Sequence, residues 1–292
     1  MDDVPYLFCD AVASSIAQME NLSKQLEPAN HSRFSSWKAA FKNHTENRLH
    51  FIVRFGFKMG EWSYTLFELN CDGFIPSKFA HLKRLNKKYL RVDCVEIDSS
   101  GSFTSNHQEI GEIINYIAPC VNLADIHLRE IVISDTDLGV FLSYFQHVSF
   151  KKITALSYRK CFEDFIIRHL QSDWLKVLSI DGELWSQELQ AEIQEFILKK
   201  SFRSVDCRGT NLMFVTAFLE NVLDLNPSHQ EVSFYCPFSF KRERLNDLEK
   251  QLEYLRKNNT GTTWIRRDRV KIAVRLYSQT LEIRLSKFEN SK

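Results

Sequence analysis

The chain contains 292 residues, and its 38 Lys and Arg against 37 Asp and Glu give a formal net charge of +1. A hydrophobic share of 44% with 26% charged residues is typical of a globular protein and excludes an intrinsically disordered chain. The even charge balance removes the simplest argument for nucleic-acid binding, which needs a strongly basic domain or stripe, so we expect no nucleic-acid partner.

The sequence shows no targeting or membrane signal. Met1 is followed by two acidic residues, Asp2 and Asp3, rather than by a basic stretch, and no apolar run reaches the roughly 18–20 residues that cross a bilayer. We therefore expect a cytoplasmic or nuclear protein with no membrane partner. The seven cysteines are scattered and form no C-x-x-C pair, which predicts buried thiols rather than a zinc site.

The N-terminal segment predicts three helical elements. Apolar residues at helical spacing over 5–16 indicate a first helix, and Leu22 and Leu26 mark a short second element. A third helix is expected over Ser32–His44. After it, Leu49–Phe57 and Ser63–Leu69 have strand-like composition, and the Gly60-containing segment between them predicts a hairpin turn.

The middle of the chain repeats a short pattern in which apolar residues occupy positions one, four and six of each predicted strand. The pattern recurs at intervals of 36, 25, 22, 27 and 27 residues, and four of these fall within the leucine-rich-repeat period. Its first positions are Val92, Leu128, Ile153, Leu175, Phe202 and His229.

The segments between these strands have helical spacing. Five helices are expected, the fourth capped by Ser186 and the fifth by Asn211. Their apolar stretches are Ile110–Ile117, Leu138–Phe145, Phe162–Leu170, Leu189–Ile197 and Val215–Val222. A strand–helix unit cannot bury its apolar face alone, so we expect an α/β leucine-rich-repeat-like solenoid with parallel strands on the concave side and helices on the convex side. An ordinary α/β fold with alternating strands and helices is the alternative.

Four regions follow from this pattern. A charged helix is expected over Lys241–Asn258, and terminal strands over Trp264–Arg275 and Thr280–Leu285. We expect an F-box-like helical segment, a hairpin with its connection, the solenoid and a cap of C-terminal strands. The expected boundaries are 1–45, 46–89, 90–260 and 261–292.

The N-terminal segment resembles an F-box. Val4–Val12, followed by Phe34–Phe41 with Trp37, is similar to a large nematode-expanded group of F-box-related proteins with irregular leucine-rich-like repeats. The resemblance implies the substrate-recognition subunit of a cullin–RING ubiquitin ligase, whose N-terminal helices dock on a Skp-type adaptor. The adaptor-binding residues that it implies are Pro5, Leu7, Phe8 and Val12. The same residues could instead cap the open end of the solenoid, since terminal repeats need capping.

The predicted concave face is mildly acidic. In a leucine-rich strand the residues between the apolar positions face the concave side, and here they carry six acids and two arginines. We expect this face to bind a basic peptide or loop of a substrate protein, whereas a solvated face without a partner is the alternative. The candidate residues are Glu96, Asp98, Glu130, Arg159, Asp181, Asp206, Arg208, Glu231 and Tyr235.

The sequence contains no catalytic, phosphate-binding or metal-binding motif. We therefore expect a non-catalytic protein-interaction module without a cofactor or metal, monomeric outside a complex. Two alternatives stay open. One is a scaffolding paralogue that does not bind an adaptor, and the other is an enzyme whose site is assembled from distant residues.

Overall fold

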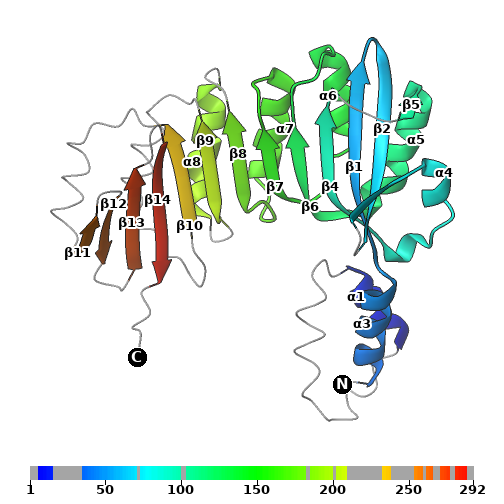
Figure 1. Cartoon of the computed structure of the whole chain (residues 1–292), viewed down its shortest axis with the longest axis horizontal. Coiled ribbons are helices and arrows are strands. Elements are labelled where there is room, and N and C mark those ends of the chain that lie inside the picture. The colour runs from blue at the N-terminus through cyan, green and yellow to red at the C-terminus, as the bar shows by residue number, and fades with distance from the viewer. Residues whose placement is uncertain are drawn as a thin grey trace. The chain divides into compact units, whose positions relative to one another are not determined.

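The structure is a computed structural model, and it shows an α/β fold in which helices accompany a mixed, largely parallel sheet (Figure 1). The chain divides into two compact units, Met1–Ala124 and Asp125–Lys292, here called the N-terminal and C-terminal units. The structure describes residues 6–15, 35–70, 73–99, 103–181, 185–199, 202–208, 232–237, 253–258, 261–265, 270–276 and 280–287.

The N-terminal unit begins with a helix pair and continues into a small sheet. Its elements are α1 (Tyr6–Ser15), α3 (Ser35–Asn47), β1 (Leu49–Lys58), β2 (Glu61–Asn70), β3 (Gly73–Ser77), α4 (Phe79–Leu82), η2 (Lys87–Tyr89), β4 (Leu90–Asp98), β5 (Phe103–Ser105), α5 (His107–Ile117) and η3 (Ala118–Cys120). The boundary between the units falls within β6 (Val121–Leu128).

The predicted hairpin is confirmed as β1 and β2, which pair antiparallel from His50–Leu69 to Lys58–Glu61. Only Met59 and Gly60 separate the strands, and both have positive φ angles of 54° and 85°. Positive φ at both central residues is the geometry of the tight turn whose twist matches that of the flanking strands. Glycine at the second position adopts it without strain.

The sheet of the N-terminal unit has the strand order β4-β1-β2-β3, with β5 paired to β2 beside β3. Strand β1 runs parallel to β4 and antiparallel to β2. The alternation of β1 buries Phe51, Val53 and Phe55 on one face. The expected helix over 110–117 is confirmed as α5, whose four isoleucines are all nearly inaccessible.

The C-terminal unit alternates strands and helices before ending in antiparallel strands. Its elements are α6 (Asp135–Ser143), β7 (Phe150–Ala155), α7 (Lys160–Leu170), β8 (Val177–Asp181), α8 (Gln187–Leu198), β9 (Ser204–Arg208), β10 (Val232–Pro237), β11 (Glu253–Asn258), β12 (Gly261–Ile265), β13 (Val270–Leu276) and β14 (Thr280–Lys287). Strands β7, β8, β9 and β10 are parallel neighbours in chain order. Strands β14, β13, β12 and β11 follow β10 in antiparallel pairs.

The predicted N-cap of α8, Ser186, is confirmed, and α6 has a serine N-cap, Ser134, that the helical spacing did not indicate. The side chains of Ser134 and Ser186 accept hydrogen bonds from the third residue of α6 and α8, so each serine is the N-cap. The expected stretches 138–145, 162–170 and 189–197 place their buried residues on one face of each helix. Figure 1 shows α7 and α8 behind the strands that they connect.

Three predicted elements are wrong in position or type. The strand expected with apolar residues at Ile153, Leu156 and Tyr158 lies earlier, because β7 covers Phe150–Ala155 and Leu156 beyond it is 51% exposed. The strand expected to start at Leu128 instead ends there, because β6 covers Val121–Leu128 and a loop leads to α6. The end of the charged helix expected over Lys241–Asn258 is strand β11, paired with β12.

Two other predicted elements lie outside the described residues, whereas the predicted terminal strands are confirmed. Leu22, Leu26 and the helix over 215–222 lie outside the described residues. The expected terminal strands are confirmed as β12, β13 and β14. Among the described residues, the helices are all too short or too polar to span a bilayer.

Candidate functional site

The first and third predicted helices, α1 and α3, pack together through a small core of their own. Cys9 and Ala13 of α1 are one turn apart and are buried against Ala40 and Phe41 of α3. Small residues at these positions let the two helix backbones approach closely. The pair therefore uses one face of α1 for its own folding.

Another part of α1 carries an exposed aromatic surface. The Phe8 side chain is 55% exposed, and its ring and the Trp37 ring form a T-shaped pair at a centroid distance of 6.0 Å. Trp37 stacks in turn on Phe41 at 5.8 Å. Val12, one turn after Phe8, is half-buried. We call Phe8, Val12 and Trp37 the Phe8 surface.

Two of the four predicted adaptor-binding residues thus lie on a described surface. Phe8 and Val12 belong to it, Pro5 lies outside the described residues, and Leu7 lies within α1 but its side chain is not described. The sequence indicated Trp37 as part of the third helix and of the resemblance to an F-box. Its spacing did not indicate that its ring would support Phe8, because that contact joins residues in two different helices.

A buried polar network centred on Asp10 fastens the helix pair to the sheet. The Asp10 carboxylate accepts hydrogen bonds from Nζ of Lys88 and from Nε2 of His44, the latter at 3.1 Å. The His44 ring lies 5.1 Å from the ring of Tyr89, whose hydroxyl accepts a 2.9 Å hydrogen bond from Asn43. These contacts join α1, α3 and η2, and η2 leads directly into β4.

The charge states of this network follow from its surroundings. Burial alone would raise the pKa of Asp10, but the contacts with Lys88 and His44 outweigh it and lower the pKa. Burial lowers the pKa of His44 despite the neighbouring Asp10. An ionised Asp10 bonded to a neutral His44 and a charged Lys88 is therefore the stable arrangement at neutral pH.

Replacing Asp10 with alanine is expected to lower the free energy of unfolding by about 2 kcal/mol, because His44 and Lys88 lose their shared acceptor. Urea denaturation at pH 7 measures the change. Asp10→Asn is the control, since an amide oxygen can still accept one of the two bonds, and it should cost less. Equal stability of the alanine variant and the wild type would contradict a network that holds the helix pair in place.

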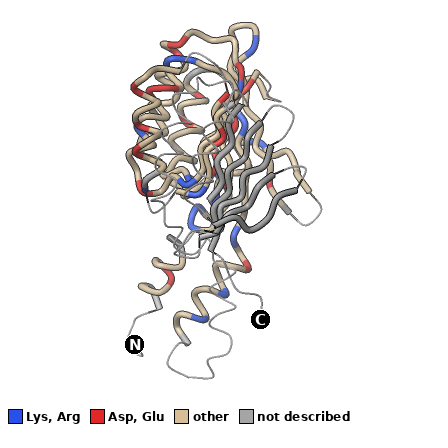
Figure 2. Tube along the Cα trace, turned by 90° about the vertical axis from the view of Figure 1, so that its left-hand side faces the viewer, with Lys and Arg blue, Asp and Glu red and all other residues tan. Residues whose placement is uncertain are grey.

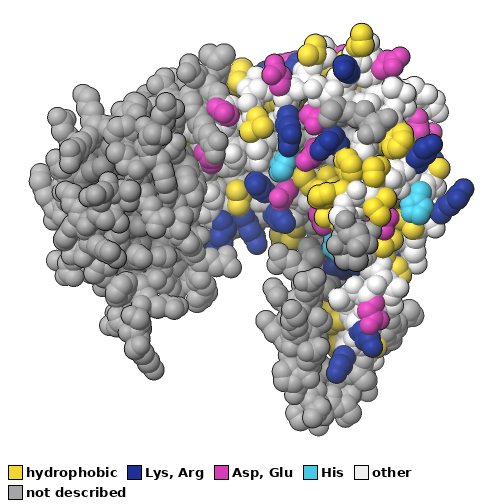
Figure 3. Space-filling view, in the orientation of Figure 1, with side chains coloured by type: hydrophobic (Ala, Val, Ile, Leu, Met, Phe, Trp, Pro, Cys, Tyr) yellow, Lys and Arg dark blue, Asp and Glu magenta, His cyan; other side chains and the backbone are white. Residues whose placement is uncertain are grey.

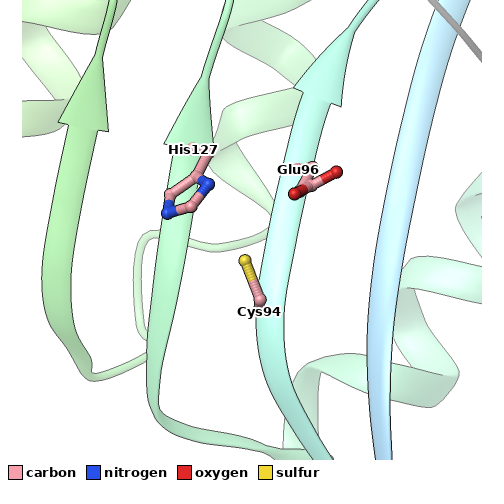
Figure 4. Close-up of side chains that lie close together, drawn as sticks. All are labelled: Cys94, Glu96 and His127. Atoms are coloured by element: carbon pink, nitrogen blue, oxygen red, sulfur yellow. The ribbon is translucent and has the colours of Figure 1, made fainter. Parts of the chain in front are cut away.

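The strand β4 carries two of the predicted concave-face acids, Glu96 and Asp98. Figure 4 shows Cys94 and Glu96, two positions apart, on this strand, and it also shows His127 on β6. Glu96 and Asp98 are each only 8% exposed. Arg54 of β1 contacts both, with Nε 2.6 Å from Oε2 of Glu96 and 3.6 Å from Oδ2 of Asp98. Both carboxylates are compensated within the N-terminal unit, and their role in binding a partner stays a prediction.

The same face of β1 and β2 becomes apolar toward β3. The guanidinium of Arg54 lies over the Phe67 ring, 5.3 Å from its centroid, and Phe67 meets Phe74 at 6.2 Å. Phe74 is 61% exposed. Figure 3 shows hydrophobic side chains gathered over this part of the N-terminal unit. A binding role for this patch would require a partner that the described contacts do not specify.

The predicted concave-face residues of the C-terminal unit occupy different environments. Arg159 lies beyond the end of β7, where it pairs with Asp135 and donates to the carbonyl oxygens of Ile131 and Ile133 at 2.7 and 2.5 Å. It therefore holds the loop before α6. Glu130 is exposed in that loop, and Asp181 and Asp206 are half-buried on β8 and β9.

The structure describes no side chain for the remaining three predicted concave-face residues. Arg208 and Tyr235 lie on β9 and β10 with side chains that are not described, and Glu231 lies outside the described residues.

Comparisons of the chain with protein-family models, curated proteins and solved structures found no match.

Proposed function

We propose that this chain is a protein-interaction module that acts as a substrate-recognition subunit of a cullin–RING ubiquitin ligase. In this proposal the Phe8 surface docks on a Skp-type adaptor, and the strand–helix units that follow present a target protein. The observation that carries the proposal is the exposed Phe8 ring on a helix that already buries another face.

Covering the exposed aromatic side chain on α1 with an apolar partner surface would be favourable. Burying a large apolar side chain contributes about 1.5–3 kcal/mol, and α1 already has Cys9 and Ala13 to bury against α3. Phe8 is not needed for that core. Its ring is held by Trp37 rather than left loose, so binding a partner would cost little side-chain entropy.

The C-terminal unit supports the second half of the proposal. Its parallel strands β7, β8 and β9 begin at Phe150, Val177 and Ser204, evenly spaced along the chain, and α7 and α8 connect them. We interpret these strand–helix units as irregular leucine-rich-like repeats of a solenoid. Such an array offers an extended surface on which a target protein can be held.

The experiment is co-purification of the full chain with a Skp-type adaptor. We expect the wild type to bind and Phe8→Asp to bind at least tenfold more weakly, because a carboxylate would have to be desolvated in an apolar contact. The matched control is Val140→Asp, which places the same charge at a residue of α6 that is 58% exposed. This control should bind like the wild type.

Two outcomes would overturn the proposal. The first is a wild type that does not bind the adaptor, and the second is equal binding by Phe8→Asp and Val140→Asp. Circular dichroism of each variant shows whether the fold is kept. If Phe8→Asp unfolds, Phe8→Ser is the substitute, since serine removes the ring without adding a charge.

A further inference from the structure

A short segment of the N-terminal unit concentrates positive charge. Between Lys78 and Arg91 the sequence has six Lys and Arg and no Asp or Glu, although the whole chain is nearly neutral. The segment comprises α4, η2 and the residues around them. By contrast, Figure 2 shows both signs of charge dispersed along much of the described chain. We call Lys78, Lys83, Arg84 and Lys87, which are all exposed, the basic surface.

Three of these lysines are held over aromatic rings. The Nζ atoms of Lys78, Lys83 and Lys87 lie 5.8, 4.3 and 4.7 Å from the ring centroids of Phe103, Phe79 and Tyr116, in that order. Cation–π contacts of this kind position an ammonium group without neutralising it. The lysines are thus partly ordered before any partner arrives, which lowers the entropy cost of binding.

The rings beneath the lysines are themselves fixed. Phe79 and Tyr116 meet edge to face at 5.6 Å, and the Tyr116 hydroxyl donates to the carbonyl oxygen of Leu82 at 3.2 Å. Lys83 and Lys87 therefore stand over two touching rings of α4 and α5. Figure 3 shows basic and histidine side chains projecting at the edge where Figure 1 places α4.

The basic surface is poorly compensated by acids. Lys83 has an exposed partner in Glu112, with the two charged groups 3.4 Å apart. For Lys78, Arg84 and Lys87, no carboxylate lies within 4.0 Å in the parts of the chain that the structure describes. An exposed lysine–glutamate pair contributes little, so Glu112 can be displaced by a stronger anionic partner.

We propose that the basic surface binds an extended protein segment rich in Asp and Glu. Three separate lysines offer point charges spread along a surface, which suits a row of carboxylates. Recognition of a single phosphate group favours a cluster of arginine forks, and only one arginine belongs to this surface. Nucleic acid would need open aromatic faces for stacking, whereas the lysines cover these rings.

The basic surface indicates what a target protein would need in order to bind there, namely a segment rich in Asp and Glu. That the acidic segment belongs to a ligase target rests on the proposed function, but its binding to the isolated chain does not depend on an adaptor. The basic surface uses α4, α5, β5 and the residues that follow α4, whereas the Phe8 surface uses α1 and α3. The two binding events can therefore be measured and lost separately.

The test is fluorescence anisotropy with the full chain and a labelled synthetic 12-residue peptide of alternating Glu, Asp, Gly and Ser. We expect wild-type binding that weakens at least tenfold in Lys83→Glu/Lys87→Glu and by a smaller factor in Lys83→Gln/Lys87→Gln. The matched control is Lys38→Glu/Lys42→Glu, because both lysines are exposed on α3. The control should stay within twofold of the wild type, and raised salt should weaken wild-type binding.

Several outcomes would overturn the inference: no wild-type binding, equal weakening in the control, or tighter binding of a single-stranded oligonucleotide or of anionic vesicles of equal charge. If Lys83→Glu/Lys87→Glu unfolds, peptide binding is compared between the wild type and Lys83→Gln/Lys87→Gln instead. Adaptor co-purification separates the two proposals. If the peptide does not bind but the adaptor does, only this inference is contradicted. If the peptide binds but the adaptor does not, only the proposed function is contradicted.

Discussion

Replacing Glu163 with alanine is expected to lower the free energy of unfolding by about 3 kcal/mol, because it removes a fully buried acceptor between two helices. The Glu163 side chain lies on α7 and is inaccessible to solvent. Its Oε2 accepts a 2.9 Å hydrogen bond from the backbone N–H of Ser186, the N-cap of α8. Its Oε1 lies 2.8 Å from Nζ of Lys160. Truncation leaves the partly buried N–H of Ser186 without its partner and a cavity beside it.

Two substitutions isolate the cause of this loss. Glu163→Gln keeps the shape and one acceptor for Ser186, so it should cost about 1 kcal/mol. Asp164→Ala removes the second, exposed partner of Lys160 and should cost under about 0.5 kcal/mol. Urea denaturation at pH 7 gives all three values. If Glu163→Ala and Asp164→Ala cost the same, the buried contact with Ser186 does not link α7 to α8.

The pH dependence of the Glu163 contact has a definite sign. Burial alone would raise the pKa of Glu163, but the bonds from Lys160 and Ser186 outweigh it and lower the pKa below the ordinary 4.5. Because the folded carboxylate binds its proton less tightly than the unfolded one, its stabilising contribution is complete above pH 4.5. That contribution is lost as the pH falls through the folded pKa.

Local periodicity predicted most of the helices and strands. It failed where the same apolar pattern fits a strand at two positions, or fits a helix as well as a strand. The isoleucines of α5 and the serine cap of α8 were predicted because a helix requires that spacing and favours that cap, whereas the serine cap of α6 was not predicted. A loose apolar pattern fits the residues after Leu128 as well as those before it, so the strand was placed too late. The four leucines of 245–255 suggested a helix, yet residues 253–258 form β11, where pairing with β12 overrides the local preference.

The candidate sites were predictable where they depend on single elements and not where they depend on tertiary contacts. Phe8 and Val12 came from the resemblance and a helical spacing. The burial of Glu96 required knowing that Arg54, from a strand far away in sequence, lies beside it. The basic surface had a readable signal, the acid-free run from 78 to 91, but the balanced net charge of the whole chain concealed it.

Lowering the pH from 7 to 4 is expected to destabilise the wild type through a second buried group, His169. Burial, helped by the charge of Arg168, lowers the pKa of His169 from 6.5 to about 4. The ring is 4% exposed and packs against Phe165 and Phe150 at 4.3 and 5.4 Å. The unfolded chain takes up this proton first, so the free energy of unfolding falls from pH 6.5 downward, by about 3 kcal/mol once pH 4 is reached.

Substituting His169 with phenylalanine should remove this loss, because the aromatic packing is kept and the proton-binding group is gone. The quantity to measure is the difference in the free energy of unfolding between His169→Phe and the wild type, which should grow by about 3 kcal/mol in favour of the variant from pH 7 to pH 4. The acids that also titrate in this range cancel in the difference. The exposed His147 serves as the control, since His147→Gln should leave the pH dependence unchanged. A constant difference for His169→Phe, or an NMR titration of the His169 ring with a midpoint above pH 6, would show that the ring is accessible to solvent and that α7 is not packed on β7 through Phe150 and Phe165.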